Sequence, residues 1–295
     1  MAGALTCLVL AIGGTQPSPS HALSIGTAKN LVRKVAGARK VPLRSLGLRQ
    51  PCHIKPENRR HLNATLFTVN TVRRFAGLPP VTFSRKNNRL AYAAAVLMNA
   101  NDYITHYPPK TWHCWSKQGY MGASTSNLSQ GAAGPDAIML YMDDPGVPSL
   151  GHRRWILNPG TKTMGSGSVS GIGLFNALYV GNYQPWKGRT NPVLWPARGS
   201  FPRFWIPDQW SATFKDWRYG KQTPSVNLRY RGHTYKPRKV RRLGDGYGSG
   251  TAFAWTLPGP LQRFGVHRMP LRVNISSPGS KSVLAHYAVR PFQLR

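Results

Sequence analysis

Acidic residues are scarce in this sequence. Eight Asp and Glu residues stand against 40 Lys and Arg, which gives the 295-residue chain a formal net charge of +32 at pH 7. Glu57 is the only glutamate, so any pair of catalytic carboxylates must come from it and the aspartates. A charge of this sign attracts polyanions such as nucleic acid, anionic envelope polymers and anionic lipids, but the sign does not choose among them. A secreted protein with a biased surface is the alternative.

Cysteine is scarce too, with three residues in the chain. Cys7 lies in the N-terminal apolar segment, which leaves Cys52 and Cys114. Neither has the spacing of a metal site, and neither belongs to a CxxC motif. In an exported protein two such cysteines predict a disulfide, and two free buried thiols are the alternative.

Long apolar runs are absent as well. No stretch approaches the roughly 18 apolar residues of a membrane-spanning helix. The run within residues 1–22 is shorter and is followed by small residues, with Ser20 and Ala22 placed as in a cleavage site. We therefore predict a signal peptide over residues 1–22 and a secreted protein. A transit peptide is the alternative, because residues 1–50 contain Arg and Ser but no acid.

The sequence has enough apolar residues, 41%, to bury a core. Residues 23–50 are basic, and Pro42 with several glycines favours a linker over a cationic helix at a membrane surface. Apolar residues at helical spacing predict helices from Pro56 to the Gly-Leu-Pro-Pro stretch, over about 84–104 with Ser84 as the cap, and over 135–144. The sequence between the last two predicts a loop rich in Trp, Ser and Gly. The stretch RRWIL after His152 predicts a short turn of helix.

The second half of the chain reads as β-structure. The stretches TMGSGSV and IGLFNALYVGNYQ predict a hairpin, and no Lys-Ser or Lys-Thr follows their glycines, so they do not form a phosphate loop. Short β-rich runs then follow between prolines and glycines: SVNLRY, GTAFAWTL, PLRVNIS and VLAHYAVRPF. They predict a small all-β, Ig-like sandwich over residues 186–295, after a first domain over 51–185.

Several stretches, in this order, resemble the CAP superfamily of cysteine-rich secretory, antigen-five and pathogenesis-related proteins. The first is LNATLFTVNTVRRFAGLPPVTFSRKNNRLAYAAAVLMNANDYITH, which resembles the family's two opening helices and first histidine. GASTSNLSQG resembles the Gly-Glu-Asn-Ile segment, and YVGNYQP loosely matches the Cys-Asn-Tyr strand. YMDDPGVPSLGHRRWILNP resembles the Trp-x-x-Glu helix and the second-histidine segment of bacterial members. The resemblance covers about residues 52–185.

This resemblance implies an α+β fold, with a CAP-type α-β-α sandwich before the all-β sandwich. It also implies a polar cleft whose positions match His106, Ser126, Asp144 and His152. Ser126 stands where the family has an acid, and Asp144 replaces a glutamate. Arg153 and Arg154 beside the cleft are interpreted as solvated, with an anion at the cleft mouth as the alternative.

Two imidazoles and a carboxylate suit a divalent metal such as Zn²⁺, so His106, His152 and Asp144 are the candidate ligands. No glutamate is left beside them to act as a general base. A Ser126–His152–Asp144 triad lacks the Gly-x-Ser-x-Gly elbow that would support it. The predicted site therefore favours binding over catalysis.

We interpret the chain as a secreted, non-enzymatic and monomeric CAP-domain binding protein. Its cleft would take a metal, a lipid or another small ligand, and its cationic surface would hold anionic envelope polymers or lipids. A metal-dependent hydrolase or peptidase is one alternative. A non-specific nucleic-acid binder is another, although no nucleic-acid motif is present.

Overall fold

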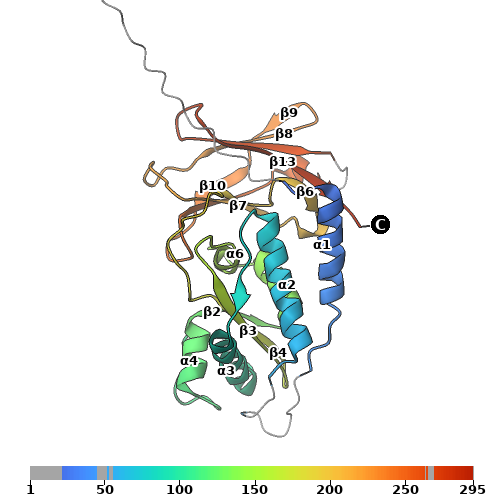
Figure 1. Ribbon diagram of the computed structural model, residues 1–295. Helices are drawn as coiled ribbons and strands as arrows, with labels where there is room; N and C mark the ends of the chain where they lie inside the picture. The colour runs from blue at the N-terminus through green and yellow to red at the C-terminus, as the bar shows by residue number, and fades with distance from the viewer. Residues whose placement is uncertain (1–21, 45–51, 53–55, 263, 265–268, 295) are drawn as a thin grey trace, which may run out of the picture.

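The computed structural model describes residues 22–44, 52, 56–262, 264 and 269–294 (Figure 1). Residues 1–21 of the predicted signal peptide, Cys7 among them, lie outside these ranges. Helices gather in the N-terminal half and strands in the C-terminal half, as the sequence patterns predict. Within the described ranges, no helix has the length and apolar character needed to cross a membrane.

The first helix, α1 (Ile25–Ala38), occupies a stretch for which the sequence favoured a linker. Ser24 caps it by accepting a hydrogen bond from the Thr27 amide at 3.2 Å. One stripe of apolar side chains, which includes Leu31 and Val35, is buried against α2 (Arg59–Phe75) and β6 (Gly199–Pro202). The linker interpretation is therefore wrong here, because a buried apolar stripe outweighs the glycines near the two helix ends.

The other predicted helices are present, with small shifts at their ends. α2 starts after the Asn58 cap rather than at the predicted Pro56. α3 (Arg85–Asn101) starts after Ser84, the predicted cap, whose hydroxyl accepts from the Asn87 amide. The helix predicted over 135–144 corresponds to α5 (Gly134–Asp143). The predicted turn of helix after His152 belongs to α6 (Gly151–Ile156).

A helix that the sequence did not predict, α4 (Lys117–Ser124), lies in the stretch assigned to a loop. It packs against α3, and a side chain at Gly122 would clash with the carbonyl oxygen of Leu90. The glycines that suggested a loop are thus needed for a close approach of two helices.

The N-terminal sheet has the strand order β1-β3-β4-β2. Its strands are β1 (Thr82–Phe83), β2 (Ser126–Gln130), β3 (Thr163–Ser170) and β4 (Leu174–Tyr179). β3 and β4 pair antiparallel, which confirms the hairpin. Gly167 faces the backbone of α3, whereas the hydroxyl of its neighbour Ser168 accepts from the amide of Gly134 in α5. Since successive side chains point to opposite faces, helices cover both sides of this sheet and form the α-β-α sandwich.

The C-terminal region consists of two further sheets, one ordered β10-β11-β7-β5 and the other β6-β13-β12-β8-β9. The first contains β5 (Val193–Trp195), β7 (Gln209–Phe214), β10 (Arg238–Arg242) and β11 (Thr251–Thr256). The second adds to β6 the strands β8 (Ser225–Tyr230), β9 (His233–Tyr235), β12 (Leu271–Ser276) and β13 (Val283–Phe292). Short 3-10 helices lie at Arg203–Trp205 and Gly259–Leu261. The four β-rich runs of the sequence analysis correspond to β8, β11, β12 and β13.

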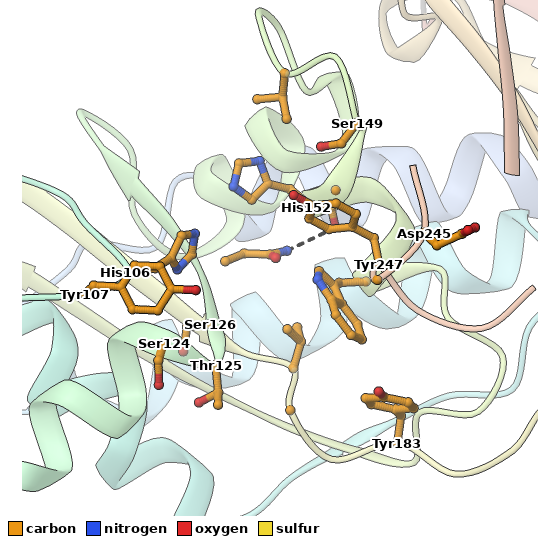
Figure 2. A pocket seen from close by; sticks show the side chains of 17 residues that line it. His106, Tyr107, Ser124, Thr125, Ser126, Ser149, His152, Tyr183, Asp245 and Tyr247 are labelled. Carbon is orange, nitrogen blue, oxygen red and sulfur yellow. Dashed lines mark hydrogen bonds between the residues drawn. The ribbon is translucent and has the colours of Figure 1, made fainter. Parts of the chain in front are cut away.

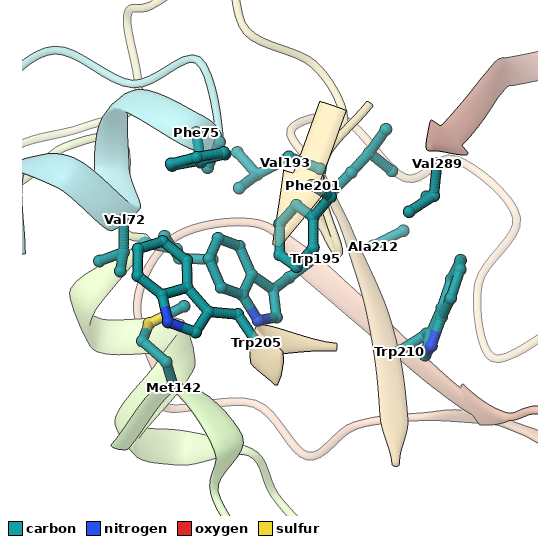
Figure 3. Packing of buried hydrophobic residues seen from close by; sticks show 14 of the residues in the cluster. Val72, Phe75, Met142, Val193, Trp195, Phe201, Trp205, Trp210, Ala212 and Val289 are labelled. Atoms are coloured by element: carbon teal, nitrogen blue, oxygen red, sulfur yellow. The ribbon is translucent and has the colours of Figure 1, made fainter. Parts of the chain in front are cut away.

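A single apolar cluster runs through both halves of the molecule. Val72 and Phe75 of α2 and Met142 of α5 lie beside aromatic side chains of the β-rich region (Figure 3). The ring of Phe75 meets that of Trp205 edge-on, with the ring centres 5.4 Å apart. The boundary at residue 185 stays a prediction, and the core is continuous across it.

Candidate functional site

A cavity of about 690 Å³ opens where the α4–β2 segment, α6 and the β10–β11 loop meet (Figure 2). His106, Ser126 and His152, three of the four predicted cleft residues, line it. The fourth, Asp144, is 2% exposed and lies behind His152. Asp245, Gly246 and Tyr247 of the β10–β11 loop complete the wall.

His152 is held from two sides. It is the second residue of α6, which follows Leu150, a buried residue with a left-handed backbone (φ 49°). Its ring nitrogen Nδ1 lies 2.7 Å from Oδ1 of Asp144, and its carbonyl oxygen accepts a hydrogen bond from Asn127 at 3.0 Å. A carboxylate only accepts, so Nδ1 carries the proton and donates. Nε2 is then the acceptor nitrogen of the neutral ring.

His106, located beyond the end of α3, has the same proton arrangement. Its Nδ1 lies 2.9 Å from the carbonyl oxygen of Ala123 in α4, and a carbonyl oxygen also only accepts. The proton therefore sits on Nδ1, and Nε2 of His106 has no hydrogen-bond partner among the described residues. Two histidines thus bring acceptor nitrogens to one cavity.

Ser126, the residue at the position of the missing acid, adds a third polar group. Its side chain is buried and its hydroxyl has no hydrogen-bond partner within the described ranges. A buried hydroxyl without a partner is costly, so this site gains stability when a ligand or a water bonds to it.

Asp144 supports the site rather than completing a set of three metal ligands. Its Oδ1 accepts from His152, and its Oδ2 accepts from the amide of Arg153 at 3.3 Å. In metal sites a carboxylate often binds the far nitrogen of a ligating imidazole in this way. The described residues contain no group of three His, Cys, Asp or Glu side chains suited to a metal ion. The donor set therefore fits a metal only in part, through the two Nε2 atoms, and metal binding stays a prediction.

Arg153 and Arg154 are buried, which contradicts the interpretation that they are solvated. Arg153 donates to the carbonyl oxygens of Met142 at 2.7 Å, Asp143 at 2.9 Å and Gln209 at 2.7 Å. Burial lowers its pKa to about 10, so the guanidinium stays charged at neutral pH. Because Gln209 belongs to β7, Arg153 connects α6, the segment that carries His152 (the histidine segment below), to the β-rich region.

Arg154 connects the histidine segment to the β10–β11 loop, which borders the cavity. It donates to the carbonyl oxygen of Gly244 at 2.7 Å, and its guanidinium carbon lies 5.4 Å from the centre of the Tyr247 ring. Burial lowers the pKa of Arg154 to about 10. A Cβ atom at Gly151 would lie 2.6 Å from the Tyr247 ring, so the absent side chain makes room for the tyrosine.

The sequence analysis did not find Asp245 and Tyr247. Their one local signal is the glycine-rich run LGDGYGSG between two β-rich stretches, which is typical of a loop. This loop and the histidine segment are far apart in the sequence and meet only through tertiary packing. Local sequence patterns therefore could not predict their contact.

The predicted disulfide between Cys52 and Cys114 is confirmed, with 5.1 Å between the two Cα atoms. It joins the chain before α2 to the loop that follows His106. The alternative of two free thiols is therefore wrong.

Comparison with known proteins identifies a protein family and solved structures similar to this chain. Residues 66–183 match the family described as "CAP: Cysteine-rich secretory protein family". The chain is similar, at 16% identity and a TM-score of 0.31, to an extracellular protein with an SCP domain from Bacillus anthracis str. Ames. That similarity covers 41% of this chain and 40% of the other. No curated protein matches the chain.

Proposed function

Since residues 66–183 belong to the CAP family, we propose that this chain is an extracellular binding protein whose cavity takes a small ligand. The observation that carries the proposal is that His106, His152 and Ser126 line one cavity, and that Nε2 of each imidazole has no hydrogen-bond partner among the described residues. Both Nε2 atoms can accept from a ligand without breaking an existing hydrogen bond.

The residues that line the cavity indicate the chemical groups that such a ligand would carry. Trp155 and Tyr183 line the cavity with their ring centres 5.3 Å apart, and Tyr247 lies on the loop side. We expect a ligand with a flat apolar face for the aromatic rings and donor groups for the two Nε2 atoms. A divalent cation such as Zn²⁺ is a second ligand that imidazole nitrogens prefer, and it would act there as a Lewis acid.

Binding is favoured over catalysis by the placement of the carboxylates. Both oxygens of Asp144 are engaged with His152 and Arg153, so it orients a ring instead of moving protons at the cavity. Asp245 is exposed at the rim and pairs with Arg242 at 3.3 Å. Neither is placed as a general base beside the two imidazoles.

Export is supported by the family, whose name denotes secreted proteins, and by the Cys52–Cys114 disulfide. Disulfides persist in oxidising compartments and are rare in the cytosol. Outside the cell, the net charge of +32 would hold the protein on anionic envelope polymers or lipids.

Histidine ¹H–¹⁵N NMR of the full protein tests the cavity directly. We expect Nε2 of both His106 and His152 to shift on addition of Zn²⁺ or of members of a panel of saccharides, amines and acyl compounds. His286, exposed on β13, serves as the internal control. The proposal fails if no compound moves the two cavity histidines more than it moves His286. Shifts that occur with Zn²⁺ and disappear in His106→Ala and His152→Ala would establish the metal.

A further inference from the structure

We infer that the outer face of the sheet β6-β13-β12-β8-β9 binds a flexible phosphate polymer through three arginines, Arg229, Arg272 and Arg290. The inference rests on the proposed role of the cationic surface and assigns that role to one face. This face lies at the opposite end of the molecule from α3 and α4 (Figure 1).

The three arginines are neighbours on that face. Arg229 of β8 and Arg272 of β12 are directly paired in the sheet register. Arg272 is also opposite Ala288 of β13, so Arg290, two residues further along β13, is at the diagonal position. Directly paired side chains have Cβ atoms about 5 Å apart, and diagonal ones are about 7–8 Å apart. The three guanidinium groups can therefore bind one polymer segment together.

All three arginines are exposed and are available to a partner. Burial alternates along the strands, with Val273 and Val289 buried and the arginines next to them exposed. None of the three forms an ion pair or a hydrogen bond with another described residue. No Asp or Glu occurs in any of the five strands, so no carboxylate of the strands themselves competes with an anionic partner.

The remaining outward side chains also suit an anion. Asn227, Asn274 and His286 occupy the next cross-strand row, and the amide and imidazole groups can donate hydrogen bonds. They extend the arginine cluster into a continuous row of donors across the three central strands.

A protective role does not explain these charges. Proteins often place Lys or Arg on edge strands to prevent sheets from pairing with each other. Arg272, however, is on β12, the central strand of the five, where no edge needs protection. Like charges directly opposite each other destabilise a sheet, so the Arg229–Arg272 pair costs stability in the free protein. A bound polyanion would remove that cost.

The chemistry of the face favours a flexible phosphate polymer over the other polyanions. The aromatic residues of β8, β12 and β13 are all buried, so the face lacks exposed rings on which bases of single strands stack. The major groove of a duplex admits an α-helix or a two-stranded β-ribbon, and the face of this five-stranded sheet is wider than either. The face also lacks a group of large apolar side chains that would insert into a lipid surface.

The test uses the full protein, long-chain inorganic polyphosphate as probe, and a matched pair of double variants. R229Q/R272Q removes two arginines from the face, and R85Q/R89Q removes two exposed arginines from α3. We expect R229Q/R272Q to weaken polyphosphate binding at least tenfold and to reduce the slope of log K against log salt by about 1.4. R85Q/R89Q should weaken it less than about twofold. R229K/R272K, which keeps the charge, should retain most of the affinity and verifies that the fold is intact.

Other outcomes overturn the inference in distinguishable ways. Equal losses in the two Gln variants would show that only the total charge matters. Tighter binding of duplex DNA or of phosphatidylglycerol vesicles than of polyphosphate, with the same dependence on Arg229 and Arg272, would replace the partner. A wild-type protein that binds none of the three probes would overturn the proposed cationic function itself.

Discussion

Nδ1 of His152 donates to Oδ1 of Asp144 over 2.7 Å, and this contact defines the candidate site. It fixes the ring tautomer and leaves Nε2 as the acceptor nitrogen. Asp144 can reach the ring because it caps α5 in a left-handed conformation (φ 57°) and is buried beneath the cavity. The sequence suggested Asp144 as a metal ligand, whereas its hydrogen bond in the structure gives it the role of orienting His152.

Asp144→Ala should therefore disturb His152 more than Asp144→Asn does. Alanine removes the acceptor and leaves the His152 Nδ1–H and the Arg153 amide without a partner, at a cost of about 1–3 kcal/mol. Asparagine keeps an acceptor oxygen and tolerates a positive φ. ¹⁵N NMR should detect the Nδ1–H tautomer in the wild type and in Asp144→Asn, and a mixture of tautomers in Asp144→Ala. An unchanged tautomer in Asp144→Ala would contradict the orienting role.

Arg153→Ala should destabilise the whole protein. The change removes the charged donor from the carbonyl oxygens of Met142, Asp143 and Gln209, the first in a buried contact and the other two in part-buried ones. We expect a loss of more than about 3 kcal/mol in urea unfolding. Arg85→Ala, at an exposed position of α3, should change stability by only about 0.5 kcal/mol. Similar losses in the two variants would mean that Arg153 does not join the two halves.

A double-mutant cycle tests whether Tyr247 packs on the histidine segment. Gly151→Ala places a Cβ atom 2.6 Å from the Tyr247 ring and should cost about 1–3 kcal/mol through overpacking. In a Tyr247→Ala background the clash is gone, and the same change should be neutral or stabilising, since alanine is the better helix former. If the two changes are additive, the loop does not contact α6 in solution.

Removal of the disulfide should lower stability without changing the cavity. Cys52→Ser/Cys114→Ser opens a loop spanning 62 residues, and chain entropy predicts a loss of about 4 kcal/mol. Thermal unfolding with and without reductant gives the comparison, and reductant should have no effect on the double variant. A wild-type protein whose unfolding is insensitive to reductant would contradict the bond.

Local patterns predicted those elements whose stability depends on local features. Examples are the alternation of buried and exposed residues in β8 and β13 and the Ser84 cap of α3. Both features depend on residues that are close together in the sequence. α4 was missed because its glycines, Gly119 and Gly122, serve a tertiary approach to α3. The family resemblance indicated His106 and His152 but could not show that the β-rich region completes their cavity.

The Arg229–Arg272 pair gives a prediction about stability that is independent of any ligand. Because the two guanidinium groups are directly opposite, Arg272→Thr should raise the free energy of unfolding by roughly 0.2–1 kcal/mol at low salt. The gain should shrink in about 1 M salt, where the screening length falls to about 3 Å. Arg229→Thr should give a similar gain, and the double variant should gain less than the sum, since the repulsion can be removed only once. Additive gains would show that the two arginines do not repel each other, and a loss in either single variant would show that the pair is stabilising in the free protein.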